Sequence, residues 1–128
     1  MTTGSCLCGA VAYRLEGDLR PSVACHCSQC RKTSGHYWSA TQVTADQFTL
    51  TSDETLTWFA SSETAKRGFC NRCGSSMFWI HEGDGGAISI ASGTLDGPTG
   101  LHTDKHIFVK DKGDYYDIAD GTPQLQKY

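Results

Sequence analysis

The sequence predicts a mainly β fold, an antiparallel β domain whose turns carry metal ligands. Short runs of β-branched and aromatic residues alternate with polar turn residues along the 128-residue chain. Only one short segment, Ser28 to Lys32, has a helical pattern. Seven cysteines also gather in three tight clusters, which places metal-binding turns between the strands.

Each expected strand is rich in residues that favour a pleated, half-buried surface, and turn residues flank it. The runs on either side of Glu82 to Gly86 predict a hairpin, because this segment holds three glycines. A less regular stretch around Pro98 precedes the last strand. The expected strands are Ala10 to Leu15, Tyr37 to Val43, Phe48 to Leu50, Leu56 to Phe59, Met77 to Ile80, Ala87 to Ala91 and His106 to Val109.

Length and charge narrow the classes of protein that fit. A chain of 128 residues without a linker-like segment fits a single zinc domain over residues 1–128. Its formal net charge of -3 gives no indication of a nucleic-acid partner. No apolar run approaches the roughly 20 residues that span a bilayer, and the polar start, Met1 to Ser5, lacks the apolar region of a signal peptide. We therefore expect a cytoplasmic protein that does not contact a membrane.

The cysteines favour metal binding over disulfides. Seven is an odd number, so they cannot all pair within one chain, and the cytosol keeps thiols reduced. Zinc binds thiolates at about 2.3 Å in a tetrahedron, which puts two sulfurs about 3.8 Å apart. Each Cys-x-Cys must therefore lie on a bend, because residues two apart in a straight strand are about 6.6 Å apart. The clusters are Cys6 with Cys8, Cys25 with Cys27 and Cys30, and Cys70 with Cys73.

Counting ligands divides the seven cysteines into four and three. Four thiolates close a structural zinc site, whereas three leave a position for water or substrate. The middle cluster supplies three within six residues, and the outer clusters supply two each. The four-cysteine site would join Cys8 to Cys70 across 61 residues. Closing that loop costs about 3.6 kcal/mol plus a constant, and a structural zinc contributes roughly 10–16 kcal/mol.

Two other arrangements of the metal remain open from the residues alone. The middle cluster could be a closed structural site with a histidine as fourth ligand, for which His26 and His36 are the candidates. His26 is the less suitable of the two, because adjacent side chains usually diverge. A single zinc, with the remaining cysteines merely buried, is the second alternative. Several cations near the cysteines either offset thiolate charge or hold an anionic substrate. They are Arg31, Lys32, Lys66, Arg67 and Arg72.

The clusters, in this order, resemble those of the glutathione-dependent formaldehyde-activating enzymes and their CENP-V-type relatives. The matching segments are Gly4-Ser-Cys-Leu-Cys-Gly-Ala-Val-Ala-Tyr13, Cys25-His-Cys-Ser-Gln-Cys-Arg-Lys-Thr-Ser-Gly35 and Arg67-Gly-Phe-Cys-Asn-Arg-Cys-Gly-Ser75. The segment Lys105-His-Ile-Phe-Val109, with Asp120 and Pro123 beyond it, also resembles the family. The chain is shorter than the members best associated with glutathione.

The resemblance implies a Mss4-like β fold with two zinc ions. It also implies a carbon–sulfur lyase reaction that joins formaldehyde and glutathione reversibly to give S-hydroxymethylglutathione. The implied structural zinc lies on residues matching Cys6, Cys8, Cys70 and Cys73, and the second, catalytic-type zinc lies on residues matching Cys25, Cys27 and Cys30.

The leading hypothesis is a zinc-dependent carbon–sulfur lyase that acts on thiol adducts, with a small-molecule thiol such as glutathione as its partner. Arg31 or Lys32 is a candidate for holding a substrate carboxylate. His26 or His36 is a candidate for moving a proton. The alternatives are a thiol- or glutathione-binding module without catalysis, and a zinc scaffold protein. The sequence does not determine the oligomeric state.

Overall fold

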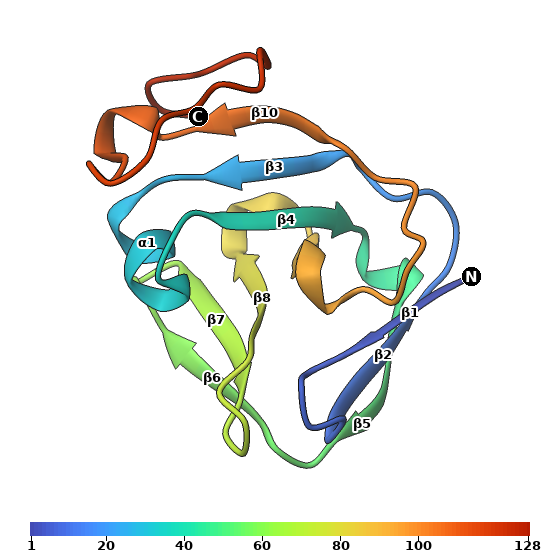
Figure 1. Cartoon of the computed structure of the whole chain (residues 1–128). Helices are drawn as coiled ribbons and strands as arrows, with labels where there is room; N and C mark the ends of the chain where they lie inside the picture. The colour runs from blue at the N-terminus through green and yellow to red at the C-terminus, as the bar shows by residue number, and fades with distance from the viewer.

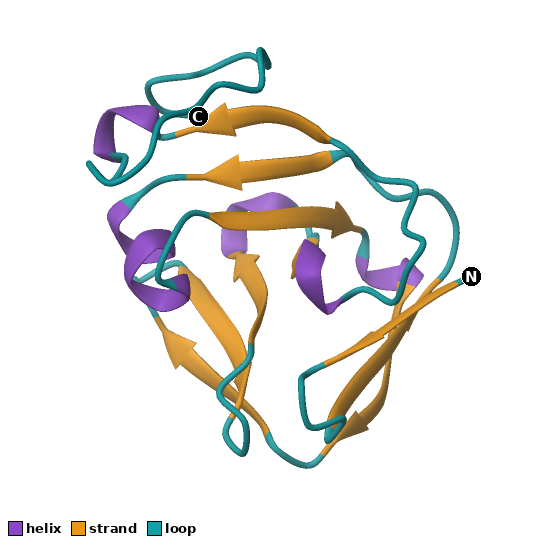
Figure 2. Cartoon of the chain, viewed as in Figure 1, coloured by secondary structure: helices purple, strands orange, loops and turns teal.

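The computed structural model describes residues 1–128 as two β-sheets with one short α-helix (Figures 1 and 2). The strands are β1 (Thr2–Ser5), β2 (Val11–Leu15), β3 (Ser22–Cys25), β4 (Trp38–Val43), β5 (Phe48–Asp53), β6 (Leu56–Ala60), β7 (Ala65–Cys70), β8 (Ser76–His81), β9 (Ile88–Ala91) and β10 (Thr103–Ile107). The helices are α1 (Ser28–Ser34) and the single 3-10 turns η1 (Ala45–Gln47), η2 (Glu82–Asp84), η3 (Ser92–Thr94) and η4 (Val109–Asp111). None of them has the length and apolar character that a membrane-spanning helix needs.

The two sheets differ in size and lie against each other. The smaller has the order β1-β2-β5, and the larger has the order β10-β3-β4-β9-β8-β7-β6. Figure 1 shows β1, β2 and β5 together on one side of the molecule and β6, β7 and β8 on the other. Antiparallel pairing dominates as predicted, but β10 runs parallel to β3. This parallel pair lies at one edge of the larger sheet, and all the other strand pairs are antiparallel.

The main core fills the space between the sheets. In β2 the burial alternates strictly, so Val11, Tyr13 and Leu15 face inward while their neighbours are half exposed. Phe78 and Ile90 of the larger sheet meet them from the other side. The Tyr13 ring lies edge-on to the Phe78 ring at 5.5 Å, a favoured aromatic geometry. A second, smaller cluster forms around the middle cysteines, and its members are Cys30, Trp38, Ala40 and Ala91.

The predicted elements match the observed ones closely in the middle of the chain. The predicted hairpin is present as β8 and β9, which pair antiparallel around η2. The predicted last strand ends two residues early, because Phe108 adopts a left-handed backbone conformation with φ 54°. Three strands were not predicted. These are β1, β3 and β7.

Candidate metal centres

The four outer cysteines meet at one point between the two sheets. Cys6 and Cys8 lie on the turn between β1 and β2, Cys70 ends β7, and Cys73 lies on the turn between β7 and β8. The Sγ atoms of Cys6 and Cys8 are 3.6 Å apart, and those of Cys8 and Cys70 are 3.8 Å apart. Tetrahedral zinc coordination requires about 3.8 Å between thiolates. The four sulfurs therefore have the chemistry and spacing to hold one metal ion.

Two glycines allow both turns to bend around the sulfurs. Gly9 has φ 82° and Gly74 has φ 81°, a left-handed conformation that strains any other residue. Ser75 joins the turns directly, because its hydroxyl accepts a hydrogen bond from the Leu7 N–H at 3.0 Å. The same hydroxyl lies 3.2 Å from Cys73 Sγ, and its hydrogen bond lowers the pKa of the Cys73 thiol to about 5. This shift favours the deprotonated form of Cys73, which is the form that binds metal.

The three middle cysteines form a second group at the start of α1. Their Sγ atoms all lie within 4.8 Å of one another. Cys27 is the N-cap of α1, and its sulfur accepts a hydrogen bond from the Cys30 N–H at 3.3 Å. Hydrogen bonds from the Cys25 and Cys30 thiols lower the pKa of Cys27, and the charge of Arg67 acts in the same direction. The end of β3 and the start of α1 thus present three sulfurs together, the donor set of an open metal site.

Arg67 closes one side of this second group. It lies in β7 and is only 6% exposed, although arginine is seldom buried. One guanidinium nitrogen, Nη2, lies 3.4 Å from Cys30 Sγ, and the guanidinium carbon lies 5.7 Å from the ring centre of Trp38. A positive charge packed against a thiol favours its thiolate form. Of the five cations that lie near cysteines in the sequence, Arg67 is the one whose guanidinium contacts a sulfur of this group.

His26 lies between two ligands but points away from them. The side chain has no exposed surface, and its Nε2 lies 2.8 Å from Nδ1 of His106. On the other side, its Nδ1 is hydrogen-bonded to the hydroxyl of Tyr116. This series of hydrogen bonds continues from His106 Nε2 to a carboxylate oxygen of Asp120 at 2.7 Å. Because both ring nitrogens of His26 are engaged, His26 is not the fourth ligand of the second group.

The polarity of this hydrogen-bonded chain follows from its two ends. The Asp120 carboxylate can only accept, so the His106 Nε2–H donates to it and His106 Nδ1 accepts. His26 therefore donates from Nε2 and accepts from the Tyr116 hydroxyl at Nδ1. Burial lowers the pKa of His26 to about 4, which keeps the ring neutral as this pattern requires. These hydrogen bonds hold His26 in place and, with it, the segment that carries Cys25 and Cys27.

The remaining sequence candidates lie on α1 or just beyond its C-terminus. His36 is exposed and belongs to a group of aromatic side chains, with its ring centre 4.3 Å from that of Tyr116. Arg31 is half-buried, and its Nε has no hydrogen-bond partner. Lys32 is exposed on the helix. His36 is not among the residues whose ligand atoms gather with the three sulfurs.

Comparison with known proteins agrees with this arrangement. The family model described as glutathione-dependent formaldehyde-activating enzyme matches residues 1–111. This chain belongs to that family. The matched region includes all seven cysteines and both of the groups they form. Tyr116 and Asp120, which complete the chain of hydrogen bonds from His26, lie beyond it.

The individual proteins that resemble this chain share only a minor part of its sequence. An uncharacterized lyase of Schizosaccharomyces pombe is 27% identical over 93% of this chain and 86% of its own. A Halomonas elongata protein, provisionally named a glutathione-dependent formaldehyde-activating enzyme, is 34% identical over 62% of this chain and 55% of its own. A crystal structure of a Rhodobacter sphaeroides protein matches with a TM-score of 0.62 and 26% identity, over 77% of this chain and 91% of that one. The family and these names support a lyase related to glutathione.

Proposed function

We propose that the protein is a zinc-dependent carbon–sulfur lyase that forms and breaks adducts between a small thiol, such as glutathione, and a small carbonyl compound, such as formaldehyde. Zinc ions would lie on both cysteine groups, two per chain. The observation that carries the proposal is the second group, where three sulfurs gather without a fourth protein ligand. The family description and the lyase name of one relative support the same reaction class.

Several residues of the chain would shape the second centre. Cys25, Cys27 and Cys30 would hold the ion, and the Arg67 guanidinium would offset the excess negative charge of the thiolates. Zinc at such a site lowers the pKa of a bound thiol, so that the reactive thiolate predominates near neutral pH. His26 would keep the turn in place rather than react, since both of its nitrogens are hydrogen-bonded.

The proposed reaction needs only one proton transfer. In the forward direction the substrate sulfur forms a bond to the carbonyl carbon, and the thiol proton ends on the former carbonyl oxygen. In reverse, the carbon–sulfur bond breaks and the hydroxyl proton returns to sulfur. We assign the proton transfer to His36, because it is exposed, its ring packs against Tyr116, and it is not enclosed as the ring of His26 is. An imidazole accepts the thiol proton and, as the imidazolium that forms, donates it to the former carbonyl oxygen, and the reverse reaction retraces this path.

Two measurements test the proposal. Zinc-loaded protein should speed the equilibration of glutathione and formaldehyde with S-hydroxymethylglutathione, followed by NMR exchange spectroscopy, above the spontaneous rate. Cys27→Ser should abolish this acceleration and lower the zinc content from two ions per chain toward one. His36→Gln should reduce the rate about 100-fold, as expected for loss of a general acid–base.

His102→Gln is the matched control for the histidine variant, because His102 is exposed and outside both centres. Binding of glutathione without any acceleration would instead favour the thiol-binding module. An equal loss of rate in the two histidine variants would remove His36 from the mechanism. A metal content of one ion per chain in the wild type would refute the second zinc site.

A further inference from the structure

Arg67 has hydrogen-bonding capacity that the protein does not use. Its Nη2 contacts Cys30 Sγ at 3.4 Å and lies 3.5 Å from the side-chain oxygen of Gln29. Its Nε and Nη1 are buried and have no hydrogen-bond partner. Together these two atoms carry three N–H groups. Buried donors are almost always paired, so a buried cation with three unpaired N–H groups indicates an acceptor that joins from outside the chain.

No carboxylate of the protein neutralises this guanidinium. The ion pairs in the structure involve Arg14, His81 and His106 as their basic partners, and Arg67 forms none. Within β-sheet pairing it lies opposite Phe59 on one side and Trp79 on the other, neither of which offers an anion. The Cys30 sulfur and the Gln29 side-chain oxygen take the N–H groups of Nη2, and the three N–H groups of Nε and Nη1 stay unsatisfied.

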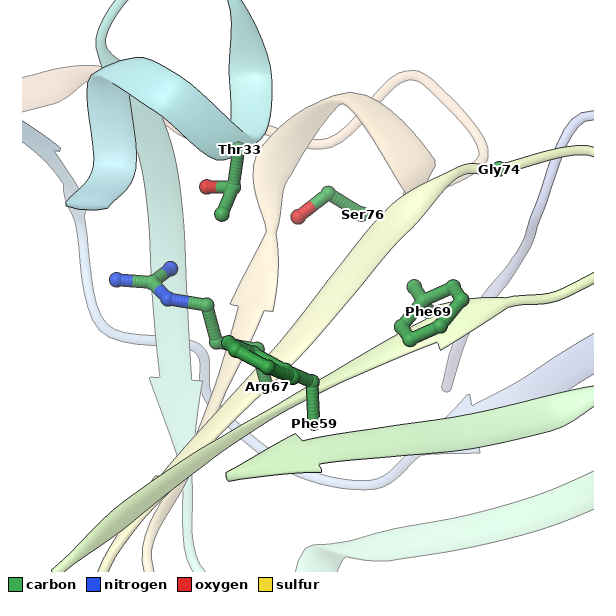
Figure 3. A pocket seen from close by; sticks show the side chains of 6 residues that line it. All are labelled: Thr33, Phe59, Arg67, Phe69, Gly74 and Ser76. Atoms are coloured by element: carbon green, nitrogen blue, oxygen red, sulfur yellow. The ribbon is translucent and has the colours of Figure 1, made fainter. Parts of the chain in front are cut away.

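A cavity begins at Arg67. Its volume is about 300 Å³, at the lower end of the range for small-molecule sites. Figure 3 shows the Thr33 side chain of α1 above the Arg67 guanidinium, with the Ser76 hydroxyl turned toward Thr33 and the Phe69 ring farther along β7. Polar groups therefore gather at one end, and aromatic surface extends from it. The cavity is lined by Thr33, Phe59, Arg67, Phe69, Gly74 and Ser76.

We propose that this cavity binds the thiol substrate through a carboxylate group, with Arg67 as the residue that recognises it. The planar guanidinium suits a carboxylate, whose two oxygens accept charge-assisted hydrogen bonds. The contact between Arg67 and Cys30 places this subsite directly beside the second cysteine group. The inference rests on the proposed function and specifies the substrate as a carboxylate-bearing thiol. It also replaces Lys32, which is exposed, as the carboxylate-binding candidate.

The test uses probes that cannot react. S-methylglutathione keeps both carboxylates but has no free thiol, and its diethyl ester lacks the carboxylates. Binding of each to the zinc-loaded protein is measured by isothermal titration calorimetry. The wild type should bind the acid about 10- to 100-fold more tightly than the diester, the range for a charge-assisted hydrogen bond. In Arg67→Met this preference should disappear, and in the control Arg14→Met, which changes a half-exposed arginine outside both cysteine groups, it should persist.

Each outcome decides the inference. A preference for the acid that survives in Arg67→Met, or a wild type that does not distinguish or bind the two probes, overturns it. If Arg67→Met does not fold by circular dichroism, Arg67→Lys replaces it and should lose at least threefold of the preference, because an ammonium lacks the planar arrangement of donors. An equal preference in the wild type and Arg67→Lys would then overturn the inference. Binding that follows these expectations without any acceleration of the formaldehyde reaction would refute the lyase proposal alone.

Discussion

The two cysteine groups should contribute unequally to stability, and the comparison of Cys73→Ser with Cys27→Ser measures the difference. Cys73 belongs to a group that joins the turn between β1 and β2 to the turn between β7 and β8. The second group lies within a single turn and the first residues of α1. Loss of the first group removes a link between the two sheets. Loss of the second group removes only a link between residues that are already close in sequence.

The size of the difference follows from the chain that each group closes. Closing the 61 residues between Cys8 and Cys70 costs about 3.6 kcal/mol of chain entropy, which the metal no longer offsets in Cys73→Ser. The four residues between Cys25 and Cys30 account for only about 1.2 kcal/mol. Serine also keeps the helix cap at position 27, because its hydroxyl is a good N-cap acceptor. We therefore expect Cys73→Ser to be less stable than Cys27→Ser by at least about 2 kcal/mol.

Urea unfolding of the zinc-loaded variants, followed by circular dichroism, measures this difference. A gap of about 2 kcal/mol corresponds to roughly 8 °C in the melting temperature of a domain of this size. The metal content of each variant is determined on the same samples, so that loss of one ion is matched to each substitution. Equal losses of stability, or a larger loss for Cys27→Ser, would refute the assignment of a clamping role to the first group.

Two further predictions concern the core that packs near the first cysteine group. Gly4→Ala should destabilise the protein by about 2 kcal/mol in thermal unfolding, because its Cβ would lie 2.3 Å from the Tyr13 hydroxyl oxygen. Gly93→Ala, whose Cβ meets nothing within 4 Å, should change stability by less than about 0.5 kcal/mol, and similar losses in both variants would contradict the steric reason. Tyr13→Phe should make stability less dependent on alkaline pH, because burial raises the pKa of Tyr13 to about 12 in the folded chain, above its ordinary value of 10. The wild type keeps this stabilisation below pH 10 and loses about 2 to 3 kcal/mol of it as the pH rises through about 12, so its advantage over Tyr13→Phe in urea unfolding should shrink between about pH 8 and pH 11.5. An advantage that stays constant over this range would show that Tyr13 does not ionise on unfolding.

Local patterns predicted much of the sheet and the grouping of the cysteines. The alternation in Val11–Leu15 and the β-rich runs of β4, β8 and β9 are visible from residue types alone. The partition of the sulfurs into four and three followed from ligand counting, and the structure gathers the same two groups. Zinc as the metal, the Mss4-like fold and the single-domain organisation stay predictions.

Longer-range features had no local signal. Ser22–Cys25 is too short to be recognised as a strand, and β7 contains both an exposed lysine and a buried arginine. Arg67 is buried because α1 and β4 pack over it. Residue type alone predicts an exposed side chain at this position, since arginine is seldom buried. His26 finds its partners 80 and 90 positions later in the chain. The only earlier indication that this later region contributes to the site was the resemblance of the segment around His106 and Asp120 to the family.

The long reach of the His26 contacts has a consequence for the order of assembly during synthesis. All four cysteines of the first group have been translated once Cys73 is added, so that group can form while the rest of the chain is still being made. The turn bearing Cys25 and Cys27 acquires its final support only after Tyr116 and Asp120 have left the ribosome. A nascent chain therefore carries three thiols whose permanent arrangement waits for residues about 90 positions later in the sequence. Until then, these thiols are open to oxidation or to capture of another metal.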